Sequence, residues 1–266
     1  MNPSGPSSRA TPTAASSDTV SQFAPEQDVS ETGLRALGLR LRQGGRLSDS
    51  VFDEVFPSGA RNVSCNFWTP VAVAQRAAWL LVQEGCRRVL DVGSGVGKFC
   101  VVGAASTDAT FVGIEHRGHL IVAAREAARR IGVSSAHFIH GTLDGMVASE
   151  FDAFYFFNPF EENLWTAEVQ LDQTVALSER RFEADVKCAQ QMLAQARVGT
   201  RVVTYYGLGA AMPTSYVLSY QEPHRSSFLK LWVKTGSGES SQVRRPRRAA
   251  RFADWDSRGA AAQGSP

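Results

Sequence analysis

The sequence has little of what builds metal centres or disulfide frameworks. Its four cysteines, Cys65, Cys86, Cys100 and Cys188, form no CxxC pair, and no histidine lies at the spacing of a zinc site. We therefore expect neither a metal-binding site nor a disulfide scaffold. Scattered free cysteines fit a reducing compartment, which predicts a cytoplasmic location.

Long hydrophobic runs and a strong charge of one sign are also missing. No apolar stretch approaches the roughly 18–20 residues that cross a bilayer, so no membrane partner is expected. The N-terminal stretch MNPSGPSSRATPTAASSD has no basic and no apolar region, and we expect no signal peptide. A net charge of +2 favours no class of partner, while 43% hydrophobic and 20% charged residues are typical of a globular protein.

Composition divides the chain into three parts. Residues 1–28 are a polar tail that is predicted to be disordered, and residues 235–266 are a second low-complexity tail. Between them, residues 29–234 are predicted to form one folded domain. The second tail contains five arginines between Arg244 and Arg251. This cluster is either a weak contact for RNA or DNA phosphates or a solvated tail.

Strand-like and helix-like segments alternate in the folded part. Helices are predicted at 48–56, 69–85, 99–105, 118–132 and 172–196, and strands at 87–92, 110–115, 136–141, 152–158 and 200–206. Thr69 is expected to cap the second of these helices. Segments 214–220 and 227–233 are expected to pair as antiparallel strands. The alternation predicts an α/β fold with a doubly wound, mostly parallel sheet that has helices on both faces and binds ligands at the carboxyl ends of its strands.

A glycine-rich turn follows the first of these strands in VLDVGSGVGKF, residues 89–99. Gly93, Gly95 and Gly97 allow the backbone to turn sharply and to approach a ligand closely. A P-loop would need one more residue before Lys98 and a hydroxyl in place of Phe99. A dinucleotide fingerprint would need glycine at Lys98, which weakens that interpretation without excluding it.

Asp91 favours a third ligand, S-adenosylmethionine (SAM). A carboxylate just before the glycines would attract the cationic amino-acid end of SAM, whereas it would repel a pyrophosphate. A tight turn without any ligand is the alternative.

Two later strand ends complete the predicted cofactor site. Glu115 ends the second strand, where a carboxylate can accept both ribose hydroxyls of SAM or of NAD. The segment HGTLDG follows the third strand. Thr142 and Leu143 could lie on either side of the adenine edge, and Asp144 could accept a hydrogen bond from its exocyclic amino group. An ordinary turn is the alternative for these three residues.

The fourth strand carries many aromatic residues and ends in Asn158, Pro159 and Phe160. The aromatic residues of FDAFYFF are expected to be core. The Asn158 side-chain oxygen and the Pro159 carbonyl could grip the N–H groups of a nitrogen nucleophile, with Phe160 as a wall of the pocket. Proline holds its carbonyl in a rigid turn because it fixes φ. An Asn-Pro loop start without function is the alternative.

Residues 67–206 resemble a class I SAM-dependent methyltransferase. The resemblance is carried by DVGSGVG, GIE, HGTLD and NPF in order and spacing. It implies a seven-stranded sheet with a closing antiparallel pair, and SAM as cofactor. DVGSGVGK with GIE is similar to the non-SET histone-lysine methyltransferases. Asn-Pro-Phe is closer to the signature of amino-group methyltransferases that act on nucleobases, glutamine or lysine.

The segment NFWTP adds three further candidates, because it resembles the segment that covers the methionine end of SAM in amino methyltransferases. These are Phe67, Trp68 and Thr69, although Trp68 could equally staple the following helix. The predicted activity is methyl transfer to a nitrogen of a protein lysine, another amine or a nucleobase. The alternatives are an NAD-type oxidoreductase and a catalytically silent SAM- or RNA-binding protein. The identity of the acceptor and the oligomeric state stay open, as does the choice between a nitrogen and an oxygen nucleophile.

Overall fold

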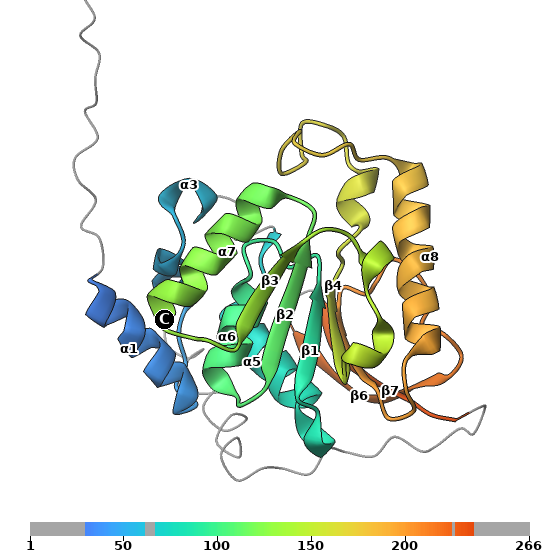
Figure 1. Ribbon diagram of the computed structural model, residues 1–266, viewed down its shortest axis with the longest axis horizontal. Coiled ribbons are helices and arrows are strands. Elements are labelled where there is room, and N and C mark those ends of the chain that lie inside the picture. Colours follow the sequence, from blue (N-terminus) through green and yellow to red (C-terminus); the bar gives the residue numbers. More distant parts are fainter. Residues whose placement is uncertain (1–29, 62–66, 225–226, 237–266) are drawn as a thin grey trace, which may run out of the picture.

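The structure is a computed structural model that describes residues 30–61, 67–224 and 227–236 (Figure 1). The predicted tail 1–28, most of the tail 235–266 and the arginine cluster lie outside these residues, so the expectations for them stay predictions. No helix in the described ranges is long and apolar enough to cross a membrane.

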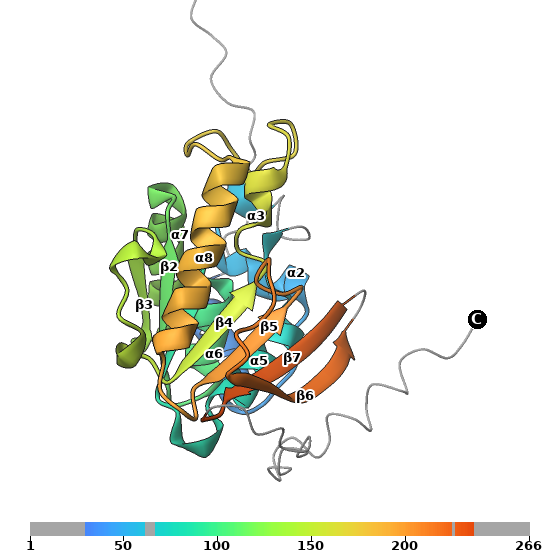
Figure 2. The same ribbon diagram turned by 90° about the vertical axis from the view of Figure 1, so that its right-hand side faces the viewer.

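A seven-stranded mixed sheet forms the centre of the domain, in the order β3-β2-β1-β4-β5-β7-β6. The antiparallel strand β7 (Ser227–Lys234) lies between β5 and the edge strand β6 (Tyr216–His224), as Figure 2 shows. The predicted closing pair is therefore confirmed. The other strands run parallel to one another: β1 (Arg88–Val92), β2 (Thr110–Glu115), β3 (Ala136–His140), β4 (Ala153–Phe157) and β5 (Arg201–Tyr205).

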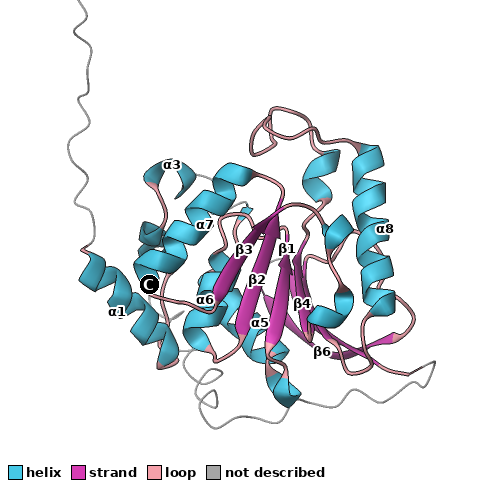
Figure 3. Cartoon of the chain, in the orientation of Figure 1, coloured by secondary structure: helices cyan, strands magenta, loops and turns pink. Residues whose placement is uncertain are grey.

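Helices cover both faces of the sheet (Figure 3). One face carries α1 (Glu31–Arg42), α5 (Val71–Leu81), α6 (Lys98–Ser106) and α7 (Gly118–Ile131), and the other carries α8 (Glu179–Gln195). Because successive strand residues point to opposite faces, the central strands β1, β2, β4 and β5 supply both cores. Shorter helical segments are α2 (Asp49–Phe52), η1 (Asp53–Val55), α3 (Ser58–Arg61), η2 (Gln83–Gly85), η3 (Leu143–Gly145), η4 (Ala148–Glu150) and η5 (Glu161–Leu164).

The aromatic residues of β4 show how the two cores are filled. Phe154 and Phe156 are fully buried against α8, whereas Tyr155 points to the opposite face. There its ring stacks on Phe99 of α6, with centroids 3.8 Å apart. Burying such a side chain contributes about 1.5–3 kcal/mol. The expectation that these aromatic residues are core is confirmed.

Three points of the helix predictions need correction. Thr69 does not cap α5, since its hydroxyl bonds to the Tyr155 hydroxyl at 3.1 Å, and the Asp49 carboxylate instead accepts the Val71 N–H at 2.8 Å. The helix expected from residue 172 begins at Glu179, where Ser178 is the cap. The helix α1 was not expected from the sequence, although Leu34 and Leu41 bury one of its faces.

Candidate active site

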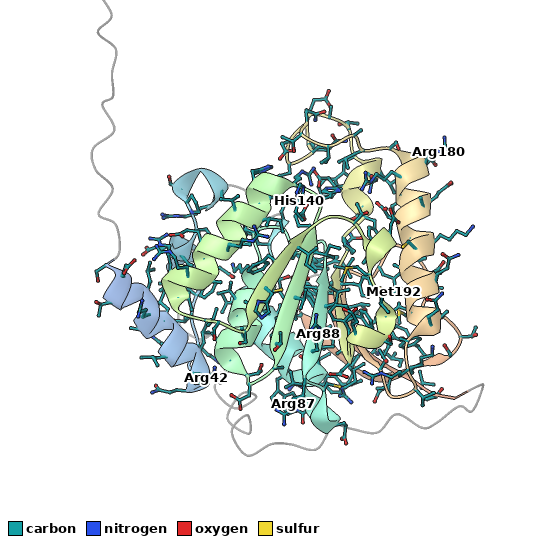
Figure 4. The ribbon with its side chains drawn as sticks, viewed as in Figure 1. Arg42, Arg87, Arg88, His140, Arg180 and Met192 are labelled. Atoms are coloured by element: carbon teal, nitrogen blue, oxygen red, sulfur yellow. The ribbon has the colours of Figure 1, made fainter. Side chains whose placement is uncertain are left out.

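A cavity of about 490 Å³ opens at the carboxyl ends of β1, β2 and β4, the position that the fold class predicts for a ligand site. In Figure 4, His140 marks this end of the sheet, and Arg87 and Arg88 mark the opposite end. A volume of 300–1,000 Å³ is typical of pockets for small molecules and cofactors. The predicted residues in its wall are Phe67, Trp68, Gly93, Gly95, Glu115, Thr142, Leu143, Asn158, Pro159 and Phe160.

The glycine turn brings the backbone to the cavity. Gly93 has φ +71°, and a Cβ atom there would lie 2.8 Å from the Cβ of Pro159. Gly95 has φ +54° and faces open space in the cavity wall. Gly97 does not line the cavity, because it packs against Phe138. Two of the three predicted glycines therefore meet the ligand space, and the third is needed for packing.

Lys98, which a phosphate-binding loop would need at its ligand, is buried away from the cavity. Its ammonium group lies 2.8 Å from the Asp49 carboxylate and 2.6 Å from that of Asp53. Its Nζ also lies 5.7 Å from the ring centroid of Trp68. The lysine therefore ties α6 to α2 and η1 and is not a phosphate ligand.

Asp91 differs from its expected place. It is 3% exposed and lies beneath the turn, where the Cys100 thiol donates to its carboxylate at 3.4 Å, and it does not line the cavity. Burial raises the pKa of Asp91 to about 7, against the opposing effect of the Cys100 hydrogen bond. Its side chain points into the core because β1 alternates, so direct contact with a ligand is not supported.

Glu115 presents its carboxylate in the cavity wall. One oxygen accepts the Gly95 N–H at 3.1 Å, and the other accepts the Arg117 N–H at 2.9 Å. Burial raises the pKa of Glu115, while these N–H donors act in the opposite direction. The two backbone contacts hold the carboxylate at the carboxyl end of β2, which is the position expected for a ribose ligand.

The turn after β3 contributes only part of what was predicted. Thr142 and Leu143 line the cavity, but Asp144 does not. The Asp144 carboxylate instead accepts the Thr142 hydroxyl at 3.2 Å. The role that was predicted for Asp144 at the adenine therefore has no support in the geometry.

The segment before α5 closes the cavity on the other face of the sheet. Phe67 and Trp68 line it, whereas Thr69 is buried beneath them and turned to Tyr155. Trp68 packs on Phe56 with ring centroids 4.7 Å apart, so it serves the core as well as the cavity. Thr69 is thus a packing residue and not a wall residue.

Asn158 follows β4 in a left-handed conformation with φ 44°. Its N–H donates to the Gly207 carbonyl at 3.1 Å, and its side-chain Nδ2 donates to the Glu161 carboxylate. Because a carboxylate only accepts hydrogen bonds, this contact fixes which end of the amide is the NH₂ group. The Oδ1 atom therefore remains the acceptor end of the side chain.

A buried arginine that sequence reasoning missed holds the next segment in place. The Arg117 guanidinium pairs with both Glu162 oxygens at 2.9 and 3.0 Å and with Asp172 at 3.1 Å. We call residues 161–174 the strap; it lies between β4 and α8 above the sheet, where Figure 1 draws it in yellow. Burial disfavours the charge of Arg117, but Glu162 and Asp172 outweigh burial and raise its pKa.

The cavity wall beyond Asn158 is aromatic. Phe157 lies 5.2 Å from Tyr205 and 5.8 Å from Tyr206 between ring centroids. On the opposite side, Phe67 and Trp165 of the strap meet edge to face at 5.6 Å. An aromatic wall of this kind suits an aliphatic chain, a planar base or a cation.

His116 is the histidine nearest to the site. It lines the cavity, and burial together with Arg117 and Arg181 lowers its pKa to about 4. The imidazole is therefore neutral near pH 7. No group of three or more metal-ligating side chains is found in the described ranges.

Comparisons with known proteins agree with this geometry. The family of protein-L-isoaspartate(D-aspartate) O-methyltransferases matches residues 56–158, which is less than half of the chain. No curated protein matches the sequence significantly.

Two solved structures of methyltransferases are similar to this chain. A putative O-methyltransferase from Klebsiella pneumoniae is 15% identical with a TM-score of 0.50, covering 77% of this chain and 99% of its own. An RNA methyltransferase from Salinibacter ruber in complex with S-adenosyl-L-homocysteine is 20% identical with a TM-score of 0.47, covering 66% of this chain and 99% of its own.

The sheet order, the cleft and the family match define a SAM-dependent methyltransferase of the class I fold. The antiparallel β7 departs from the all-parallel 3-2-1-4-5-6 sheet of dinucleotide-binding domains, so the fold does not support the NAD-type alternative. The cavity residues fit SAM, because Gly95 leaves open space beside the Glu115 carboxylate.

Proposed function

We propose that the enzyme transfers the methyl group of SAM to a nitrogen atom of its acceptor. The observation that carries this proposal is the orientation of Asn158. Glu161 binds its NH₂ end, which leaves Oδ1 to accept an N–H of the substrate. The Pro159 carbonyl, on a residue packed against Gly93, is the second acceptor at the same wall of the cavity.

Methyl transfer requires alignment more than covalent chemistry from the protein. Bound SAM supplies a sulfonium methyl group that an in-line nucleophile attacks. Asn158 and Pro159 orient the nitrogen by its N–H groups, so that its lone pair points to the methyl carbon. Phe160 and Tyr205, which are both buried, keep water away from the nitrogen.

The charges around Asn158 favour an amine over a carboxylate. Glu161 lies beside Asn158, and the two predicted contacts are both hydrogen-bond acceptors. A substrate carboxylate, such as that implied by the isoaspartate O-methyltransferases, would meet only acceptors and a like charge there. An amine or an amide supplies the donors that these oxygen atoms need.

The nature of the methylated product tests this proposal. Host lysate is incubated with the enzyme and radiolabelled SAM, and the product is treated with mild alkali. N-methyl groups resist this treatment, whereas methyl esters release volatile methanol. We expect stable label, and release of most of the label would overturn nitrogen as the acceptor atom. Prior digestion with protease or RNase shows which class of molecule carries the label.

Asn158→Ala tests the assigned residue. Losing an oriented hydrogen bond to the reacting group lowers turnover by about 100-fold or more. Binding of S-adenosylhomocysteine, measured by calorimetry, should stay within about threefold, which is under 1 kcal/mol. Val169→Ala, an exposed change in the strap outside the cavity wall, is the matched control. Equal methyl transfer in the Asn158 variant and the control would contradict the role of Asn158.

A further inference from the structure

A second cavity, of about 540 Å³, lies beside the active-site cavity at the end of β5. Its wall is formed by the segment that follows β5 and by side chains of β7, two strands that Figure 2 shows side by side. Tyr206 lines both cavities. A ligand that contacts Tyr206 can therefore have one part in each cavity, and both cavities have the size of small-molecule pockets.

Tyr206 is held next to the residue that is proposed to grip the acceptor nitrogen. Its φ is 63°, and Asn158, at the end of the neighbouring strand β4, has φ 44°. The Asn158 N–H donates to the Gly207 carbonyl at 3.1 Å, which ties the two turns together. Residues other than glycine rarely adopt this conformation, and where they do they cluster at functional sites. The two turns therefore belong to one site.

The wall of the second cavity is largely apolar and has one cation. Among its described residues, Lys230 alone carries a charge. Lys230 forms no ion pair within the described ranges. Phe228, Lys230 and Trp232 alternate along β7 with Leu229 and Leu231, which are buried in the core of the opposite face. Because side chains alternate along a strand, the lysine points to the same face as the two aromatic residues that line the cavity.

Two exposed aromatic side chains border the same cavity. Phe228 is 48% exposed and Tyr206 is 46% exposed. Lys230 pairs across the sheet with Thr204, which is two residues before Tyr206, so the cation and the two rings lie at one end of the sheet. An apolar body in the cavity would cover the rings, and an anionic group on it would pair with the lysine.

We propose that the second cavity holds the part of the acceptor beyond its reacting nitrogen, and that this part is an apolar body with an anionic group, a carboxylate or a phosphate, that pairs with Lys230. The inference rests on the proposed function, since it places the nitrogen at Asn158. Tyr206 lies between the two parts and is a specificity-determining residue for the acceptor. Glu161 beside Asn158 and Lys230 in the second cavity attract opposite ends of such a molecule, which fixes its direction.

Binding of small fluorinated probes tests the second cavity without methyl transfer. Fluorine NMR measures fluorobenzoate, fluorophenyl phosphate and the neutral fluorobenzamide with the full chain, after S-adenosylhomocysteine has saturated the cofactor site. The wild type should bind at least one anion about tenfold more tightly than the neutral probe. The tighter of the two anions shows whether the cavity prefers a carboxylate or a phosphate. Lys230→Met should remove the preference for an anion, whereas Tyr206→Ala should weaken all three probes by about threefold or more.

Matched variants make the result specific to the lysine in the cavity. Lys230→Arg keeps the cation and should keep the preference for an anion. Lys187→Met removes an exposed lysine of α8 outside both cavity walls and should bind every probe as the wild type does. Thermal unfolding checks that each variant is folded, and Lys230→Gln replaces the methionine variant if that one is not.

A second measurement asks whether the probes occupy part of the acceptor site. Methyl transfer from radiolabelled SAM is followed in a dilution series of host lysate. The tighter anion should inhibit it, and more lysate, but not more SAM, should relieve the inhibition. Lys230→Met should need about fivefold more lysate to reach half of its maximal rate, with that rate within about twofold of the wild type, because the lysine binds the acceptor away from the reacting atoms.

Several outcomes would overturn the proposal. The wild type could bind none of the probes, or bind anionic and neutral probes equally, and Lys230→Met could keep the preference of the wild type. An anion that binds without competing with the lysate would make the second cavity a site separate from the acceptor. Methyl groups that mild alkali releases would instead reject nitrogen as the acceptor atom and would leave the probe binding unchanged, so the two failures are distinguishable.

Discussion

The two sides of the active-site cleft are built in different ways. On the cofactor side, short turns directly after β1 and β2 place Gly93, Gly95 and Glu115, and each hydrogen bond that holds them has a backbone N–H as its donor. On the acceptor side, a long segment after β4 carries Asn158 and the strap, and the buried Arg117 guanidinium holds the strap through Glu162. Cofactor binding thus depends on local geometry, and acceptor placement depends on long-range ion pairs.

The variant with the largest expected effect on the difference between the two sides is Arg117→Met. It leaves Glu162 and Asp172 without their cation, and breaking a buried pair costs about 3 kcal/mol or more of unfolding free energy. Urea unfolding measures this loss. Hydrogen exchange should rise in the strap and change little in the glycine turn, residues 91–99, because the two sides are held separately.

Arg129→Met is the matched control, because Arg129 lies on the same helix α7 but pairs with Glu126 and Glu31 at the surface. It should leave the unfolding midpoint and the exchange of the strap unchanged. Uniform loss of protection on both sides of the cleft in Arg117→Met would contradict the separation of the two sides.

The cofactor side is tested by Glu115→Ala, with the next largest effect. Hydrogen bonds to a charged group contribute about 1.5–3 kcal/mol each, so losing the ribose contacts should weaken binding of S-adenosylhomocysteine by about 100-fold or more. Calorimetry measures the change, and Glu126→Ala on the exposed face of α7 is the control. Affinity within a few-fold of the wild type would remove Glu115 from the cofactor site.

Asp91→Asn tests the protonation state of the carboxyl group that is buried beneath the glycine turn. Burial raises the pKa of Asp91 from 3.8 to about 7, so the folded state favours the protonated acid. Its contribution to stability is therefore full below pH 3.8 and is lost as the pH rises to about 7. Relative to the variant, the free energy of unfolding of the wild type should fall by up to about 1.4 kcal/mol for each pH unit in this window.

Urea unfolding of both proteins at pH 5, 6 and 7 checks this slope. Glu126→Gln serves as a control of opposite sign, because Arg129 lowers the pKa of Glu126, and its contribution is instead lost as the pH falls. A stability difference between wild type and Asp91→Asn that is constant with pH would show that Asp91 is ionised in the folded state.

Sequence reasoning succeeds where neighbouring residues decide the structure. The strand and helix periods predict the sheet, and the spacing of Gly93, Gly95 and Glu115 after their strands brings them to one cavity. It fails where distant residues decide. Thr69 bonds to Tyr155 and not to its own helix, and Asp91 turns inward because the pleat of β1 places it there.

The acceptor side shows the same limit. No sequence pattern predicts that Arg117 pairs with Glu162 and Asp172. These residues are far apart in the chain and meet because the strap folds back to the end of β2. The sequence does not single out Asn163. Its Oδ1 has no partner in the described part of the chain because the residue is buried and the Nδ2 end of its amide bonds to the Phe160 carbonyl, and only the fold shows this. The sequence nevertheless marked the neighbouring Asn158-Pro159-Phe160, because these residues directly follow a strand.

The close approach of Gly93 and Pro159 is one of the places where the two halves of the cleft meet. A methyl group on residue 93 would collide with the proline ring, and the positive φ of Gly93 disfavours any other residue there. Positions 93 and 159 are therefore sterically coupled, although one lies on the cofactor side and the other on the acceptor side. An engineer who grafts a different acceptor motif after β4 must redesign the glycine turn with it, because the two motifs share one surface.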